Sequence, residues 1–161
     1  MMSTCMQAVP FIVLMADDST DDCLVAQAAW DECRLGKELR FVHDGEELMN
    51  YLTHRGTYGD PVTSPRPGLI ILDLNMPKKD GCSALVEIKS DHALQDIPVL
   101  VLTTSRVAKH IDSAYNLGAH SFVTKPNSLD GYLELMQGLT KYWSKGHPVH
   151  NLQRVKHVHL N

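Results

Sequence analysis

Five short apolar segments, each followed by a stretch with helical character, constrain the fold of this chain more than any other feature. Three of them, "FIVLMA", "LIILDL" and "VLVLTT", are continuously apolar, which is typical of strands that are buried on both faces. Helices that connect parallel strands can cover both faces of the sheet. The sequence therefore predicts an α/β fold with a doubly wound, five-stranded parallel sheet in strand order 2-1-3-4-5 and right-handed crossovers.

The boundaries of these elements follow from turn and capping signals. We expect strands at 10–16, 39–43, 69–74, 97–104 and 120–124, and helices at 19–36, 44–56, 81–91, 106–118 and 128–143. Residues 57–68 contain three prolines and two glycines and are expected to form an unusually long loop. Residues 10–143 are thus interpreted as one domain, and residues 144–161 as a C-terminal extension.

The extension differs in composition from the rest of the chain. It holds three Lys or Arg residues, four histidines and no acidic residue. The pair His157 and His159 has a spacing that could present two imidazoles to a metal ion. For a chain end we favour a loose tail or an oligomer contact over that alternative.

Overall composition is that of an ordinary globular protein, with 43% hydrophobic residues and a formal net charge of −4. A nucleic-acid binder would show a strong basic excess, and no apolar run has the length needed to cross a bilayer. Residues 1–10 lack the features of a secretory signal, and the four scattered cysteines form no Cys-x-x-Cys pair. We therefore expect a cytoplasmic protein that contacts neither nucleic acid nor membrane directly.

Charged and hydroxyl side chains follow the predicted strands at the points where these strands end. The segment "LMADDSTDD" places four carboxylates within six positions, and this crowding of like charges requires a cation nearby. The carboxyl ends of parallel strands meet at one edge of a sheet. The residues that this rule brings together are Asp17, Asp18, Asp73, Thr103, Thr104, Lys125 and Pro126.

Each of these residues also has a purely structural interpretation. Asp17 and Asp18 suit the start of a helix, Asp73 suits a turn, and Thr103 is a common strand residue. Their joint occurrence at four strand ends favours a site. Carboxylates without thiols suit Mg²⁺, and a lysine and a hydroxyl beside such a cluster suit phosphoryl transfer to a carboxylate.

The motifs "LMADDS", "LIILDLNMPKKDG", "VLVLTT" and "FVTKP", in this order, resemble the receiver domains of bacterial two-component response regulators, which have the CheY-like fold. The resemblance covers about residues 10–143. It implies that Asp73 accepts a phosphoryl group and that Asp18 binds Mg²⁺ directly. Asp17 would act through a water molecule, and the main-chain carbonyl of Asn75 would complete the metal ligands.

The same resemblance implies a switch. Lys125 would pair with the phosphoryl group, the Thr103 hydroxyl would move towards it, and Phe122 would then turn inward. The peptide bond between Lys125 and Pro126 would be cis, as it usually is in this family. The signal would be read from the surface formed by residues 106–117, 120–124 and 128–143.

The sequence contains no output domain, so it resembles stand-alone regulators that receive their phosphoryl group from a sensor histidine kinase and act on a downstream protein. Such a protein is a phosphoacceptor and not an enzyme, apart from its own phosphoryl transfer and autodephosphorylation. The long 57–68 loop and the extension are similar to regulators that partner cyanobacterial and bacterial phytochromes.

The last predicted helix carries more large apolar groups than one buried stripe requires, among them Tyr132, Leu135, Tyr142 and Trp143. We therefore expect a two-fold homodimer built on that helix and on the apolar positions of the extension. The alternative is that these side chains pack on their own domain.

Two other functions remain open at this point. A flavodoxin-like electron carrier would need a phosphate cradle rich in Ser, Thr and Gly for FMN, whereas "DDSTDD" repels phosphate. A magnesium-dependent aspartyl-phosphate phosphatase would need a carboxylic acid two residues beyond Asp73, where this chain has Asn75.

Overall fold

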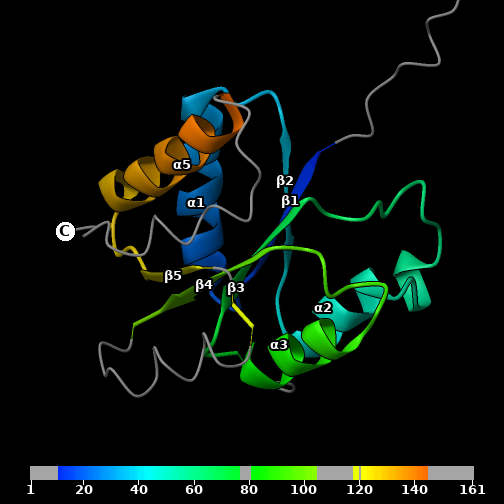
Figure 1. Cartoon of the computed structure of the whole chain (residues 1–161). Helices are drawn as coiled ribbons and strands as arrows, with labels where there is room; N and C mark the ends of the chain where they lie inside the picture. The colour runs from blue at the N-terminus through cyan, green and yellow to red at the C-terminus, as the bar shows by residue number, and fades with distance from the viewer. Residues whose placement is uncertain (1–10, 77–80, 105–117, 120, 145–161) are drawn as a thin grey trace, which may run out of the picture.

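The computed structural model describes residues 11–76, 81–104, 118–119 and 121–144, with only the backbone described for 140–144. Five parallel strands form one sheet in the order β2-β1-β3-β4-β5, which confirms the predicted topology (Figure 1). The strands are β1 (Ile12–Ala16), β2 (Glu38–Val42), β3 (Leu69–Asp73), β4 (Val99–Thr103) and β5 (Ser121–Thr124).

Helices cover both faces of this sheet. They are α1 (Thr20–Cys33), α2 (Gly45–Leu52), α3 (Gly81–Ser90) and α5 (Leu129–Ser144), with a short 3-10 turn η2 (Gly56–Tyr58). Figure 1 shows α1 and α5 together on one face, and α2 and α3 on the other. The helix expected at 106–118 lies almost entirely outside the described residues and stays a prediction. Within the described part of the chain, no helix is both long and apolar enough to span a bilayer.

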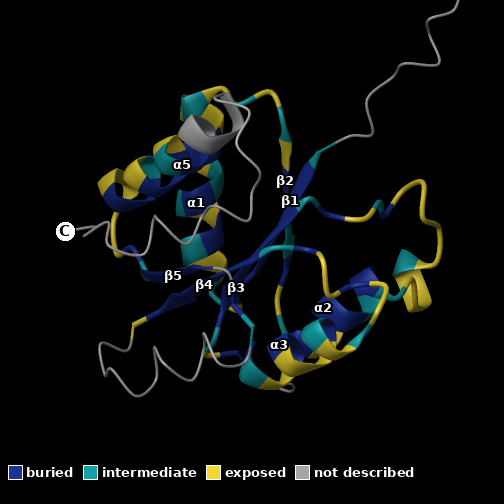
Figure 2. Cartoon of the chain, in the orientation of Figure 1, coloured by how far each residue is buried: buried dark blue, intermediate teal, exposed yellow. Residues whose placement is uncertain are grey.

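Two hydrophobic cores, one on each face, explain why the strands are continuously apolar. In β1, Val13 and Met15 join the core under α1 and α5, whereas Leu14 and Ala16 join the core under α2 and α3. Every residue of β1, β3 and β4 is buried (Figure 2). A parallel sheet covered on both faces has no side on which polar residues could alternate.

Two helices end earlier than their glycines predicted. α1 ends at Cys33 because Arg34 takes a left-handed conformation, with φ of 51°, before Gly36 is reached. α2 ends at Leu52, and His54, with φ of 56°, reverses the chain before Gly56. Backbone N–H groups that donate to carbonyls of the last turn compensate for the cost of these conformations in residues other than glycine.

The large apolar residues of α5 do not support the reasoning behind the expected dimer. Tyr132 is 1% exposed and Leu135 is 3% exposed, and both belong to the core that α5 shares with α1. Leu129, the first residue of α5, is 42% exposed. The side chains of Tyr142 and Trp143 lie outside the described part, so the structure does not test their part in a dimer.

The 57–68 loop is attached to the domain by a set of hydrogen bonds that we call the loop network. The Tyr51 hydroxyl donates to the Pro65 carbonyl at 2.9 Å, and the Arg40 guanidinium donates to the Thr63 carbonyl. The Tyr58 hydroxyl donates to Glu47 Oε2 at 2.6 Å. The predicted loop is therefore present and contains η2, and side chains of β2 and α2 hold it in place.

Candidate phosphoryl and metal site

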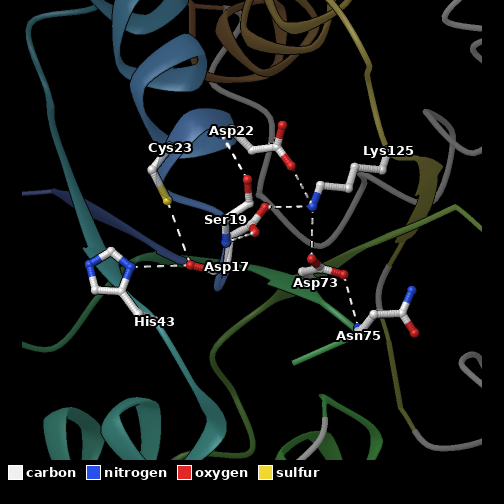
Figure 3. Close-up of polar contacts among 8 residues, drawn as sticks. All are labelled: Asp17, Ser19, Asp22, Cys23, His43, Asp73, Asn75 and Lys125. Atoms are coloured by element: carbon white, nitrogen blue, oxygen red, sulfur yellow. Dashed lines mark hydrogen bonds and ion pairs between the residues drawn. The ribbon is translucent and has the colours of Figure 1, made fainter. Parts of the chain in front are cut away.

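The carboxyl ends of three strands meet at one edge of the sheet and bring the predicted charged residues together. Asp17 directly follows β1, Asp73 is the last residue of β3, and Lys125 directly follows β5. β1 and β3 are neighbours, with Ala16 opposite Leu72, so the two aspartates lie side by side. Figure 3 shows Lys125 reaching across this edge to both of them.

The ammonium group of Lys125 is the centre of the site. Its Nζ lies 2.9 Å from one Oδ2 oxygen in each of three carboxylates, those of Asp17, Asp22 and Asp73. The lysine side chain is only 11% exposed. Burial alone would lower the pKa of Lys125, but the contacts with Asp22, Asp73 and Asp17 outweigh it and raise this pKa. The ammonium is therefore held in its charged form.

Asp17 is the most deeply buried acid of the site, with no exposed surface. Its Oδ1 accepts a hydrogen bond from the backbone N–H of Ser19 at 2.9 Å. Its Oδ2 contacts Lys125 as an ion pair but accepts no hydrogen bond from any described residue. Burial raises the pKa of Asp17, and the nearby Asp73 carboxylate adds to this rise. The ionised form of Asp17 therefore destabilises the folded state in this position.

The start of α1 positions Asp22. The Ser19 side chain caps the helix by accepting a hydrogen bond from the Asp22 backbone N–H at 3.1 Å. This cap places Asp22 in the first turn of α1, where its carboxylate reaches Lys125 (Figure 3). Cys23, the next residue, is buried against the Asp17 carbonyl, and burial raises the pKa of its thiol to about 12. Cys23 is therefore an inert core residue.

Asp73 is held by the turn that follows β3. Its Oδ1 accepts a hydrogen bond from the Asn75 backbone N–H at 2.9 Å, while its Oδ2 faces Lys125. Gly81, the first residue of α3, packs directly against this turn. A Cβ atom there would lie 2.6 Å from the Asp73 carbonyl oxygen and 2.5 Å from Leu74 Cα. Only glycine allows the chain to return so close to Asp73.

The remaining predicted residues lie at the same end of the sheet. Thr103 ends β4 and is 1% exposed, and its carbonyl accepts a hydrogen bond from the Lys125 backbone N–H at 2.8 Å. Phe122 in β5 is 5% exposed and belongs to the core under α2 and α3. It already points inward, so a switch would have to repack it rather than bury it for the first time.

The predicted cis bond is wrong. No peptide bond among the described residues is cis, so the bond between Lys125 and Pro126 is trans. The trans form is favoured in X–Pro bonds by about 0.5–1 kcal/mol, and here both the backbone N–H and the ammonium of Lys125 meet their partners with it.

Three carboxylates of the site suit a divalent cation. Ligand oxygens of Asp17, Asp18 and Asp73 all lie within 4.8 Å of one another. Asp18 is exposed, so it can reach a hydrated ion, whereas the Oδ2 of Asp17 is buried and lacks a hydrogen bond. An oxygen-only cluster that includes an unsatisfied anionic oxygen fits a hard cation.

Two residues of the site were not predicted from sequence. Asp22 appeared only as one of four crowded acids, and nothing in its spacing distinguished it from Asp21. His43 follows β2, and its Nδ1 lies 3.2 Å from the Asp17 carbonyl oxygen. Its position at a strand end was a usable signal, because residues after β2 face the same edge as Asp17.

Comparison with known proteins defines the class. The family description of the response regulator receiver domain matches residues 13–137, and the chain belongs to this family. This membership favours the receiver interpretation over the flavodoxin-like and phosphatase alternatives.

Particular relatives are similar over most of their length. Response regulator Rcp1 from Synechocystis is 37% identical over 134 residues, which cover 83% of this chain and 89% of that protein. The crystal structure of its Mn²⁺-bound form has a TM-score of 0.74, and the match covers 83% of this chain and 94% of that chain at 37% identity.

Two further solved structures are also similar. The phosphorylated cyanobacterial phytochrome response regulator RcpA has a TM-score of 0.77 at 36% identity, covering 86% of this chain and 96% of that one. A response regulator in red light signalling of R. palustris has a TM-score of 0.77 at 33% identity, covering 84% and 94%.

Proposed function

We propose that this protein is a phosphorelay response regulator that accepts a phosphoryl group on Asp73, with Mg²⁺ as the cation that the reaction requires. The contact of 2.9 Å between Lys125 Nζ and Asp73 Oδ2, beside the cluster of Asp17 and Asp18, carries this proposal. Asp18 and Asp73 are assigned as direct metal ligands, and Asp17 as a ligand through water. The Asn75 carbonyl supplies the third protein ligand.

The transfer is a displacement at phosphorus. An Asp73 carboxylate oxygen forms a bond to phosphorus while the bond to the donor atom breaks, and the donor leaves with that electron pair. The donor atom is an imidazole nitrogen in a phosphohistidine and an acetate oxygen in acetyl phosphate. A cation held by Asp17, Asp18 and Asp73 would supply charge neutralisation for the phosphoryl oxygens, and the ammonium of Lys125 contributes to the same neutralisation.

The phosphoryl group is later lost by hydrolysis. A water oxygen attacks phosphorus, and inorganic phosphate, a proton and the free Asp73 carboxylate are formed. We propose no reaction of this protein on any other substrate, because Asn75 offers no general acid beside Asp73. In this sense the protein is a phosphoacceptor and not an enzyme.

We assign the surface that a downstream protein recognises to β5 and the elements beside it. Phosphorylation adds about two negative charges and new acceptor oxygens at Asp73. Thr103 ends β4, Lys125 follows the neighbouring strand β5, and the Lys125 backbone N–H donates to the Thr103 carbonyl. The two side chains therefore lie at the same edge of the sheet and can bind these oxygens. Movement there would repack Phe122 and change the surface of residues 106–117, β5 and α5 that a downstream protein reads.

We assign the kinase to the sensor histidine kinases, and specifically to phytochromes. Two similar proteins support this assignment: RcpA is a phytochrome response regulator, and the R. palustris protein acts in red light signalling. The phosphorelay is placed in the cytoplasm, with residues 10–143 as the receiver domain and 144–161 as an extension outside it.

A homodimer stays part of the proposal on narrower grounds. Tyr132 and Leu135 are used within the domain, so the contact would rest on the end of α5 and on residues 144–161. Sedimentation of the full chain and of a chain ending at Trp143 tests it. A dimer that dissociates on truncation supports the assignment, and two monomers would end it.

Labelling with a small phosphodonor tests the main proposal. In Mg²⁺ and acetyl phosphate, the intact protein should gain one phosphoryl group, measured by intact mass, and should gain none in EDTA. Asp73→Asn should stay unlabelled, whereas Asp130→Asn, which removes an exposed acid at the start of α5, should label like the parent. Labelling of Asp73→Asn at the parental level would show that the acceptor is another residue.

A further inference from the structure

The ammonium of Lys125 already contacts three carboxylates in the unphosphorylated protein. A lysine offers three N–H donors. Here three carboxylate oxygens, from Asp17, Asp22 and Asp73, each lie 2.9 Å from Nζ (Figure 3). A phosphoryl oxygen on Asp73 would therefore compete with these three contacts for the same ammonium.

The three carboxylates differ in how easily they release the lysine. The side chains of Asp17 and Asp73 are 0% and 3% exposed, so either one would be left as a buried charge without its partner. The Asp22 side chain is 34% exposed and can be hydrated when the contact breaks. The contact with Asp22 is therefore the least costly of the three to lose.

We propose that Asp22 is a positioning residue that holds Lys125 in the unphosphorylated site. On phosphorylation of Asp73, Lys125 gives up its contact with Asp22 and contacts a phosphoryl oxygen instead. The inference rests on the proposed phosphorylation of Asp73. It assigns a role to an acid in the first turn of α1 that touches neither the metal cluster nor the acceptor directly.

The charge of Asp22 opposes the phosphorylated state. Both Asp22 and Asp73 contact the same nitrogen atom, so the Asp22 carboxylate lies close to the place where the phosphoryl charge develops. It competes for Lys125 and also repels the new anion. Asp22 thus sets how much phosphodonor is needed to switch the protein.

A matched set of variants tests this role. Asp22→Asn removes the charge and keeps the size, and Asp21→Asn removes the neighbouring charge in the same helical turn, where the side chain is exposed and is expected not to contact Lys125. Asp22→Glu keeps the charge. The phosphorylated fraction at subsaturating acetyl phosphate and the rate of phosphoryl loss are measured for all of them and for the parent.

Asp22→Asn should raise the ratio of phosphorylated to free protein by roughly two- to fivefold, the range for losing one partly exposed ion pair. Asp21→Asn should stay at the parental level, and Asp22→Glu should return towards it. The Mg²⁺ affinity of Asp22→Asn, measured by quenching of intrinsic fluorescence, should not rise. A merely loosened helix would lower both quantities together.

Several outcomes would overturn the inference. One is an Asp22→Asn protein that matches Asp21→Asn or is phosphorylated less than the parent, and another is an Asp22→Glu protein that behaves like Asp22→Asn. These results would leave the phosphorylation of Asp73 intact, because the parent is labelled in the same experiment. A parent that takes no label would instead remove the proposed function, and the role of Asp22 with it.

Discussion

The strand-end site and the loop network are both polar, yet they use their polar groups in opposite ways. In the loop network, Tyr51 and Arg40 donate to backbone carbonyls of the 57–68 loop, and Arg40 also pairs with Glu38, whose side chain is 54% exposed. In the site, three carboxylates contact one ammonium, and burial raises the pKa of Asp17.

The difference separates polar groups that stabilise the fold, as in the loop network, from polar groups that serve the function of the site. Hydrogen bonds to carbonyls in the loop network fix geometry and should be insensitive to ions. The site keeps unrelieved negative charge that a cation can neutralise. Stability of the site should therefore depend on Mg²⁺, whereas stability of the loop network should not. The following five variants, one of them a matched control, test this contrast, from the largest expected effect to the smallest.

Lys125→Met should break the site most strongly. It leaves Asp17 and Asp73 buried without their cation, and we expect a loss of about 3 kcal/mol in the free energy of unfolding in EDTA. Part of the loss should return in Mg²⁺, because the ion binds only the folded state. Urea unfolding with and without Mg²⁺ measures both effects.

Lys89→Met is the matched control for that variant. Lys89 is also partly buried, but its ammonium donates to the backbone carbonyls of Gln95 and Ile97, at 3.0 and 2.8 Å. We expect a loss of about 1–2 kcal/mol that is the same in EDTA and in Mg²⁺. A Lys125→Met protein no less stable than this control in EDTA would contradict the description of the site.

Asp17→Asn should stabilise the metal-free protein by about 1 kcal/mol near neutral pH, because the raised pKa of Asp17 means that its ionised form is less favourable in the folded state than in the unfolded state. The pKa of Asp17 is raised above 3.8, so the folded state keeps this proton to higher pH than the unfolded state does. The associated stability is present below about pH 4 and is lost as pH rises through the raised pKa.

The advantage of Asp17→Asn over the parent should therefore disappear in acid and reverse in Mg²⁺, because only the parent keeps the full cluster. Thermal unfolding of both proteins across pH, in EDTA and in Mg²⁺, measures this. A variant that is less stable than the parent in EDTA near pH 7 would mean that Asp17 is adequately paired by Lys125 alone.

Tyr51→Phe tests the loop network. It removes a hydroxyl that donates to Pro65 and that accepts a hydrogen bond from Arg40 at 3.3 Å. We expect a loss of about 1 kcal/mol in the free energy of unfolding, equal in EDTA and in Mg²⁺. A loss that changed with Mg²⁺ would show that the loop network and the site are coupled.

Tyr58→Phe should have the smallest effect and a distinct pH dependence. Burial and the hydrogen bond to Glu47 raise the pKa of Tyr58 to about 12 from its ordinary value of 10.0. The stability that this phenol contributes is present below about pH 10 and is lost as pH rises through about 12. Near neutral pH we expect Tyr58→Phe to lose about 0.5–1 kcal/mol.

The difference between parent and Tyr58→Phe should shrink between pH 10 and 12. Urea unfolding of the pair at each pH measures it, and other alkaline titrations cancel in the difference. A gap that stays constant across this range would mean that the Tyr58 phenol does not depend on Glu47.

Much of the fold was accessible from local sequence patterns. Continuous apolar runs predicted β1, β3 and β4 because both faces of these strands are covered, and the capping residues Ser19 and Asp44 marked helix starts correctly. The ends of α1 and α2 were missed because Arg34 and His54, rather than glycines, take the left-handed conformation. Arg carries no signal for this conformation, and His, although enriched in it, adopts it far less readily than glycine does.

The sequence by itself determined which strand ends carry acids, a hydroxyl and a lysine, because the topology of a parallel sheet collects all such ends at one edge. Only the tertiary structure decided which carboxylates contact the ammonium of Lys125. It placed Asp22, and not Asp21, against Lys125, and it buried Tyr132 and Leu135 within the domain. Such choices depend on how α1 and α5 pack against each other across distant parts of the chain, and no local pattern encodes that packing.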